Sequence, residues 1–167
     1  IVLIGGAGFI GHNMALRLHE QGANVEIIDS LQVNNLASFA SGNSETPSRD
    51  LYLRILHQRL DLLYQAGIPV HVQDARDYAG QNHILNQIKP QVIIHLAAVS
   101  HAGRSNKDPY STFDHSLRTL ENALDAARDN VEHFIYFSSS MAYGNFTTDE
   151  VDEEHPLNPL GIYGALK

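Results

Sequence analysis

The sequence predicts an α/β fold, a doubly wound parallel sheet with helices on both faces, and two patterns along its 167 residues indicate this. Short apolar runs rich in β-branched residues alternate with longer stretches of helical spacing from one end of the chain to the other. Each apolar run is nearly unbroken, which is typical of parallel strands covered on both faces. Right-handed crossovers between such strands give the expected strand order 3-2-1-4-5.

The expected elements follow one another in regular order. Strands are expected at residues 1–4, 24–28, 69–72, 91–95 and 132–137, and helices at residues 10–21, 50–65, 78–88 and 110–129. We therefore expect one domain over residues 1–167. Because the first residue already lies in a strand and the last in a helix, we also expect this domain to be part of a longer polypeptide.

The crossover after the second strand, residues 31–66, is longer than a βαβ unit requires. It begins with turn formers that follow no clear period, over residues 31–47, and continues as an amphipathic helix. The apolar face of that helix is expected to consist of Leu51, Ile55, Leu56, Leu60 and Leu63. An extra loop before the helix is the simpler interpretation, and a loop that contacts a cofactor or a partner is the alternative.

The amino-acid composition argues against several classes of function. A net charge of −8 without a cluster of Lys and Arg argues against a nucleic-acid partner. The absence of cysteine excludes disulfide and thiolate chemistry, and the ten histidines are scattered without the spacing of ligands, so no metal is expected. No apolar run approaches the roughly 20 residues of a membrane span, and no basic flank marks a signal peptide. We therefore expect no membrane contact and a cytoplasmic location.

Three glycines, Gly5, Gly8 and Gly11, separate the first strand from the first helix in the pattern G-x-x-G-x-x-G. Gly5 would make the tight turn out of the strand, Gly8 would let the main chain touch a phosphate, and Gly11 would let helix and strand pack closely. A pyrophosphate would lie at the start of the helix, near Phe9 and Ile10, held by backbone N–H groups and the helix dipole. The loop predicts a Rossmann-type, dinucleotide-binding fold.

Two carboxylates follow strands at the same predicted edge. Asp29 ends the second strand, with Ser30 next to it, and could accept both adenosine-ribose hydroxyls while repelling a 2′-phosphate, which predicts NAD rather than NADP. A turn or helix-capping role is the alternative for Asp29. Asp74 follows the third strand and could meet the adenine amino group, although Asp is also common at strand ends.

Four motifs in the same order resemble the extended short-chain dehydrogenase/reductase family, the NAD-dependent nucleotide-sugar epimerases and dehydratases. They are GGAGFIG at 5–11, HLAA at 95–98, FSSSMAYG at 137–144 and YGALK at 163–167. The resemblance spans the whole chain. It implies bound NAD, a nucleotide-sugar substrate, a homodimer, and a small C-terminal substrate domain that lies outside these residues. It also adds members to the predicted cofactor site, namely Asp74, Ala75, Leu96, Ala97, Ala98, Ser138, Tyr163 and Lys167.

The resemblance also assigns the catalytic residues, Ser139, Tyr163 and Lys167. Tyr163 and Lys167 are four residues apart and therefore share one face of a helix. A nearby ammonium and the positive nicotinamide favour the phenolate, so Tyr163 becomes a usable general base. Ser139 would hold the reacting sugar oxygen near Tyr163. Taken alone, this Tyr–Lys spacing more often marks an aromatic residue and a solvated lysine.

Ser140 and Met141 follow the predicted catalytic hydroxyl, where dehydratases of the family carry Asp-Glu and related decarboxylases keep a Glu. Neither residue can act as an acid or base, so the resemblance favours epimerisation, most like that of UDP-sugar 4-epimerases. Tyr163 would remove a hydroxyl proton, hydride would pass to NAD, and the keto-sugar would turn over before hydride returns. The alternatives are a sugar or steroid-like dehydrogenase/reductase and a non-catalytic NAD-binding sensor.

Three residues depart from the family pattern. Where the family often has Asn-Val-x-Gly-Thr, this chain has HSLRT, with His115 at the Asn position and Arg118 at the Gly position. His115 could contact the cofactor in place of the Asn, or the local geometry could differ. His12 replaces the usual Ser after the last glycine, which puts that phosphate contact in question.

Overall fold

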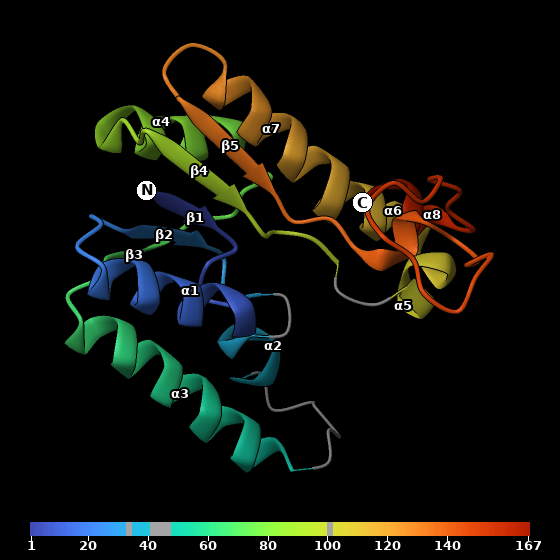
Figure 1. Cartoon of the computed structure of the whole chain (residues 1–167). Helices are drawn as coiled ribbons and strands as arrows, with labels where there is room; N and C mark the ends of the chain where they lie inside the picture. The colour runs from blue at the N-terminus through green and yellow to red at the C-terminus, as the bar shows by residue number, and fades with distance from the viewer. Residues whose placement is uncertain (33–34, 41–47, 100–101) are drawn as a thin grey trace.

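The computed structural model describes residues 1–32, 35–40, 48–99 and 102–167 and contains the expected parallel sheet (Figure 1). The strands lie in the order β3-β2-β1-β4-β5, which confirms the predicted order. They are β1 (Val2–Ile4), β2 (Glu26–Asp29), β3 (Val70–Val72), β4 (Val92–His95) and β5 (His133–Tyr136). All neighbouring pairs are parallel, so the carboxyl ends of the strands meet at one edge. The direction of winding reverses between β1 and β4.

Helices cover both faces of this sheet, with α1 and α3 on one face and α4 and α7 on the other (Figure 1). The helices are α1 (Phe9–Glu20), α2 (Leu36–Ala40), α3 (Arg49–Gln65), α4 (Tyr78–Ile88), α5 (Ala102–Lys107), α6 (Pro109–Thr112), α7 (Arg118–Ala127) and α8 (Ile162–Ala165), with a π-helical turn η1 (Phe113–Leu117) and a 3-10 turn η2 (Ser140–Ala142). Among the described residues, no helix combines the length and apolar character that crossing a bilayer requires.

Two segments differ from the sequence expectation. The stretch expected to lack regular structure after the second strand contains the short helix α2, and residues 33–34 and 41–47 of that stretch lie outside the described residues. The helix expected at 110–129 begins at Pro109 and passes through the π-helical turn η1 before it continues as α7. Its start is set by Asp108, whose side chain accepts the Ser111 N–H at 3.0 Å.

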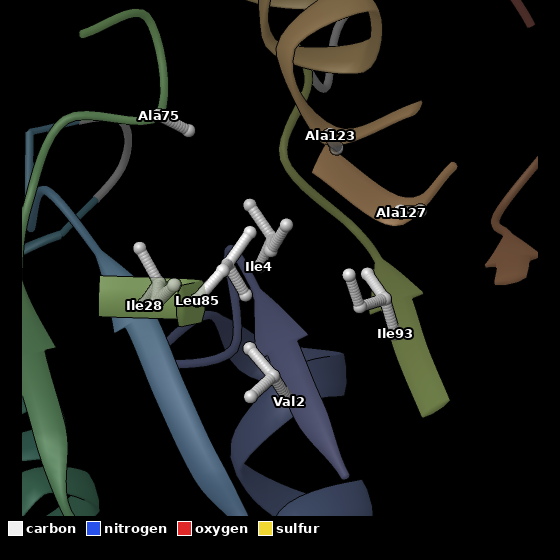
Figure 2. Close-up of a cluster of buried hydrophobic side chains, with 8 residues drawn as sticks. All are labelled: Val2, Ile4, Ile28, Ala75, Leu85, Ile93, Ala123 and Ala127. Atoms are coloured by element: carbon white, nitrogen blue, oxygen red, sulfur yellow. The ribbon is translucent and has the colours of Figure 1, made fainter. Parts of the chain in front are cut away.

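The core is divided between the two faces of the sheet because side chains alternate along each strand. Val2 and Ile4 point to the face covered by α4 and α7, where they pack with Leu85 and Ala123 in the cluster that Figure 2 shows. Leu3 points the other way, into the cluster beneath α1 and α3. Each fully buried aliphatic side chain of this kind stabilises the fold by about 1.5–3 kcal/mol relative to an exposed one.

The buried face of α3 is not the one that the sequence predicted. Leu56 and Leu63 are buried as expected, but Leu51 and Ile55 are 50% and 45% exposed. The prediction was wrong there because the first half of α3 packs against α2, with Phe39 and Tyr52 stacked at 5.3 Å, whereas the second half reaches the sheet. The buried row of α3 consists instead of Leu56, Arg59 and Leu63, with Leu60 partly buried beside it.

This corrected face can be checked by truncating two leucines of the same helix. Leu63→Ala removes a side chain with 0% exposure and is expected to lower the free energy of unfolding by about 2–5 kcal/mol. Leu51→Ala, at 50% exposure, is the matched control and is expected to change it by about 0.5 kcal/mol or less. Urea unfolding followed by circular dichroism measures both. Equal losses for the two variants would contradict the assignment.

Candidate functional site

A cavity of about 380 Å³ lies at the carboxyl edge of the sheet, where the winding reverses. It is bounded by the turn after β1, the start of α1, and the residues that follow β2, β3 and β4. The predicted cofactor residues that line it are Gly5, Gly8, Phe9, Ile10, Gly11, Asp29, Ser30, Asp74, Ala75, Leu96, Ala97 and Ala98. Ser138, Tyr163 and Lys167 are not among its lining residues.

The glycine turn brings backbone close to the cavity at two positions. Gly5 has φ +79°, and a Cβ there would lie 2.6 Å from the backbone nitrogen of Ala97, so only glycine fits without strain. Gly8 begins α1 without a side-chain cap, and within 4 Å a Cβ there would meet only the Gly5 carbonyl oxygen, at 3.5 Å. A side chain at Gly8 would therefore occupy cavity space in front of the helix N–H groups.

Gly11 has a different neighbour from the one expected. A Cβ at Gly11 would lie 2.5 Å from the Gly6 carbonyl oxygen, so α1 approaches the turn itself and not the strand before it. The close approach is needed because the helix must start directly behind the turn if its N-terminus is to face the cavity.

Asp29 fastens this turn to the end of β2. Its carboxylate accepts the Ala7 N–H at 3.0 Å and the Leu31 N–H at 2.8 Å, one on each oxygen. Burial raises the pKa of Asp29, and the two backbone N–H groups act in the opposite direction. A carboxylate oxygen can accept more than one hydrogen bond, so lone pairs remain for ribose hydroxyls on the cavity side. Asp29 is thus a turn-fastening residue as well as a predicted ribose contact.

Asp74 lies at the end of β3 in a network that the sequence did not reveal. Its carboxylate pairs with Arg76 at 2.6 Å, and Arg76 reaches across to Asp114 at 2.7 Å. The hydrogen bonds from Arg76 hold the pKa of Asp74 below its usual range. Asp74 therefore stays an acceptor at neutral pH, as an adenine amino group requires.

His115 and Arg118, the two residues of the HSLRT segment that differ from the family pattern, lie in different places relative to the cavity. His115 lines the cavity from the π-helical turn η1, together with Thr119, whose hydroxyl donates to the His115 carbonyl oxygen at 3.0 Å. Arg118 turns away and pairs with Asp114 at 2.8 Å, outside the cavity lining. The contact between His115 and a cofactor stays a prediction, but its place in the cavity wall is observed. π-Helical turns occur often at functional sites.

His12 does not line the cavity. Its ring Nδ1 lies 3.0 Å from the Gly8 carbonyl oxygen, and because a carbonyl only accepts, Nδ1 carries the proton in this contact. Burial lowers the pKa of His12, which favours the neutral ring. In this structure His12 therefore fastens the first turn of α1, and a phosphate contact by its side chain is not indicated.

The predicted catalytic residues lie beside the end of β5, the strand next to β4, and outside the cavity lining. Lys167 donates from Nζ to the Phe137 carbonyl oxygen at 3.0 Å, and the Ser138 hydroxyl donates to the Lys167 carbonyl oxygen at 2.5 Å. The Tyr136 hydroxyl donates to the carbonyl oxygen of Leu166 at 2.6 Å. Burial lowers the pKa of Lys167. Three side chain to backbone bonds thus hold Leu166 and Lys167 against the strand. Because α8 ends at Ala165, Lys167 lies beyond the helix, and the expectation that it shares a helical face with Tyr163 was wrong.

Ser139 and Tyr163 stand near this junction without touching. The Ser139 hydroxyl oxygen accepts the Met141 N–H at 3.2 Å and begins η2, and α8 contacts η2. Within the described part of the chain, no hydrogen bond joins Ser139 to Tyr163, or Tyr163 to Lys167. The structure brings the three predicted catalytic residues to one edge of the sheet, and their joint action stays a prediction.

Residues that sequence reasoning missed also line the cavity: Ile28, Arg59, Gln73 and Thr119. Arg59 is the most informative of them, because it comes from the long crossover and is 8% exposed. A signal for it was present in the sequence, since Arg59 lies three residues after Leu56 and four before Leu63, in the middle of an apolar row. The helix of the long crossover therefore contributes a side chain to the cavity wall, and a cofactor or partner contact by the loop before that helix stays a prediction.

A doubly wound parallel sheet with a glycine turn and a cavity at its point of reversal defines a dinucleotide-binding α/β protein. The sequence model described as the NAD dependent epimerase/dehydratase family matches residues 1–167. The chain belongs to this family. This result confirms the resemblance inferred from the four motifs, and NAD is the cofactor.

Among the proteins that the chain resembles are 4-epimerases of UDP-sugars. The chain is 28% identical over 170 residues to UDP-glucose 4-epimerase of Rhizobium leguminosarum bv. trifolii and 29% identical over 174 residues to UDP-arabinose 4-epimerase 1 of Arabidopsis thaliana. These alignments cover 100% of the chain but 43% and 36% of the two relatives. The chain spans less than half the length of the curated relatives that it matches.

A solved structure shows the same fold with the cofactor bound. UDP-glucose 4-epimerase of Thermus thermophilus, in complex with NAD, matches with a TM-score of 0.74 and 28% identity over 99% of this chain and 46% of that protein. The cavity described above fits a dinucleotide on its own geometry, since an unobstructed glycine and an uncapped helix N-terminus face the same space.

A methyl group at Gly8 tests this fit. Gly8 has φ −72°, which alanine adopts readily, so Gly8→Ala is expected to fold normally but to weaken NAD binding by about tenfold or more by filling the phosphate position. Isothermal titration of the full-length protein measures the affinity. Gly103→Ala, where a Cβ meets nothing within 4 Å, is the control and should bind NAD like the wild type. Unchanged binding by Gly8→Ala would contradict the site.

His95 gives the fold a pH dependence. Its ring is 1% exposed at the end of β4, and burial, helped by the charge of Lys167, lowers its pKa to about 4. The unfolded chain binds a proton near the usual value of about 6.5, so it gains protons before the folded state as the pH falls. The free energy of unfolding should therefore decrease by about 3 kcal/mol between pH 6.5 and pH 4 on account of His95.

Thermal or urea unfolding across this range checks the effect. His95→Gln should flatten the pH dependence, whereas the exposed His133, replaced by Gln, should leave it as in the wild type. A slope unchanged by His95→Gln would show that other groups cause the acid sensitivity.

Proposed function

We propose that the full-length protein is an NAD-dependent nucleotide-sugar epimerase of the UDP-sugar 4-epimerase type. The observation that carries the proposal is the position of α8. It contacts η2, whose N-cap is Ser139, and the two residues after it, Leu166 and Lys167, are fastened to the end of β5, beside β4, whose following residues line the cavity. The identities of 27–29% to 4-epimerases of UDP-glucose and UDP-arabinose support it.

In the proposed mechanism, Tyr163 takes the proton from a sugar hydroxyl. Its phenol is partly exposed and makes no hydrogen bond among the described residues, so it is available to a substrate. Ser139 would donate to the same sugar oxygen and fix its direction, as the hydroxyl is already oriented by the Met141 N–H. Bound NAD would accept a hydride from the sugar carbon and return it to the opposite face of the keto-sugar.

Lys167 would supply positive charge at this junction. Its ammonium is held by the Phe137 carbonyl oxygen and lies 5.6 Å from the centre of the Tyr136 ring. No hydrogen bond among the described residues joins this ammonium to Tyr163, so its proposed contribution is the positive charge that it brings to the end of β5. The role of Lys167 in this proposal is therefore electrostatic and positional.

The residues after Ser139 favour epimerisation over dehydration. Ser140 and Met141 form the exposed outer side of η2, and Met141 is 45% exposed. Neither can donate or accept a proton usefully at neutral pH, whereas eliminating water needs an additional acid or base. Returning the hydride to the same carbon requires no further acid or base, which agrees with the residues present.

We also propose a homodimer, as the family resemblance implies. The fourth crossover carries large apolar side chains on its outer side: Tyr110, Phe113 and Leu124 are 82%, 45% and 48% exposed. Burial of such side chains against a second copy would stabilise an isologous contact. The molar mass of the full-length protein in solution decides this point, and a monomer at micromolar concentration would contradict it.

Activity is tested on the full-length protein with a panel of UDP-sugars and no added NAD. Interconversion of 4-epimers with retained cofactor is the expected result, and Tyr163→Phe should lower kcat by about 10²–10⁴-fold. Ser139→Ala should also lower kcat, and Tyr64→Phe, on an 85% exposed ring of α3, should not. Stoichiometric release of NADH with a stable keto product would favour a dehydrogenase, and full activity of Tyr163→Phe would exclude the mechanism.

A further inference from the structure

Arg59 is an unusual residue in the wall of the cavity. It lies in the buried row of α3, flanked by Leu56 and Leu63, and only 8% of it is exposed. Arginine is rarely buried to this extent unless its charge is paired. Of the cavity-lining residues in the described ranges, Arg59 is the only one with a permanent positive charge. A positive charge buried at this position would be stabilised by an anionic ligand in the cavity.

The protein itself satisfies little of the guanidinium. One nitrogen, Nη1, donates to the Ala7 carbonyl oxygen at 3.1 Å, while the buried Nε has no hydrogen-bond partner. Burial lowers the pKa of Arg59, and the charge of Asp29 offsets part of that effect. No ion pair within 4.0 Å joins Arg59 to Asp29 in the described structure, because both oxygens of Asp29 are turned to backbone N–H groups.

The surroundings indicate which anion would fit. The guanidinium reaches the cavity beside Ala7, in the middle of the glycine turn, and near Asp29, where the adenosine ribose is expected. A guanidinium presents several N–H donors in one plane, a geometry that suits phosphate oxygens.

We propose that Arg59 is a phosphate-binding residue of the cofactor site, which contacts a phosphoryl group next to the adenosine ribose. Two sources share this chemistry, the 5′-phosphate present in NAD and a 2′-phosphate as in NADP. The contact would place a cation from the long crossover opposite the N-terminus of α1, so that one phosphoryl group meets charge from two sides. The proposal concerns cofactor binding and stands independently of the epimerase activity proposed above.

A structural role is the competing explanation, since Arg59 also holds the Ala7 carbonyl oxygen. The two roles differ in the ligands and in the variants that they affect. A phosphate contact affects 5′-AMP, 2′-AMP or NAD and spares adenosine. A turn-holding role would be shared with Asn35, which donates to the same Ala7 carbonyl oxygen at 3.1 Å, so Asn35→Ala would then reproduce the losses of Arg59→Met, whereas a phosphate contact of Arg59 leaves Asn35→Ala with normal nucleotide binding.

The test is titration calorimetry of the full-length protein with adenosine, 5′-AMP, 2′-AMP and NAD. Arg59→Met is expected to weaken 5′-AMP and NAD, or 2′-AMP, by about tenfold to a hundredfold and to change adenosine by less than about twofold. The nucleotide that loses affinity identifies the source of the phosphate. Equal losses for adenosine and the nucleotides, or no loss for any of them, would overturn the proposal. Arg54→Met, on an exposed position of the same helix, is the matched control and should bind all four ligands normally.

A measurement on the wild type keeps the proposal testable if Arg59→Met does not fold. The Nε–H resonance of Arg59, assigned in protein labelled with ¹⁵N-arginine through its loss in Arg59→Lys, should shift on adding 5′-AMP or 2′-AMP and stay in place with adenosine. The Arg54 resonance should not move with any ligand. A shift of Arg59 that adenosine reproduces in full would assign the residue to the turn and overturn the proposal.

Discussion

The close approach of backbone to backbone at the turn between β1 and α1 is the constraint on which the rest of the structure depends. Gly5 takes a positive φ against Ala97, and Gly11 brings α1 against Gly6. These contacts fix the start of α1 at the carboxyl edge of the sheet, at the point where the winding reverses. Without them the N-terminus of α1 would not face the cavity. The carboxylates at the ends of β2 and β3 would then lie at the edge of the sheet with no helix N-terminus beside them.

Ala7, in the middle of that turn, links the long crossover to the cofactor site. Its N–H is accepted by Asp29, and its carbonyl oxygen receives hydrogen bonds from Asn35 at 3.1 Å and Arg59 at 3.1 Å. Residues from β2, from the stretch before α2 and from α3 therefore meet at one residue. The extra length of this crossover is explained in part by these contacts, because a minimal connection could not place both side chains beneath the turn.

Sequence reasoning predicted the sheet order and most of the cavity wall, because both follow from local patterns. Unbroken apolar runs mark buried parallel strands, and the glycine spacing marks the turn at Gly5 and Gly8. It could not place Leu51 and Ile55, since their exposure depends on where α3 runs past the sheet. The salt bridge between Arg76 and Asp114 could not be predicted from the sequence for a related reason, because it joins segments that are far apart in the chain.

The fastening of Ala7 at both its N–H and its carbonyl group has a consequence for the thermodynamics of cofactor binding. A loose turn would have to give up about 1–2 kcal/mol of backbone conformational entropy per residue when a dinucleotide orders it. Here Asp29 and Asn35 hold the turn in place before any ligand arrives, so that loss has already occurred during folding. The backbone N–H groups of the preorganised turn can therefore bind a ligand with little further loss of conformational entropy.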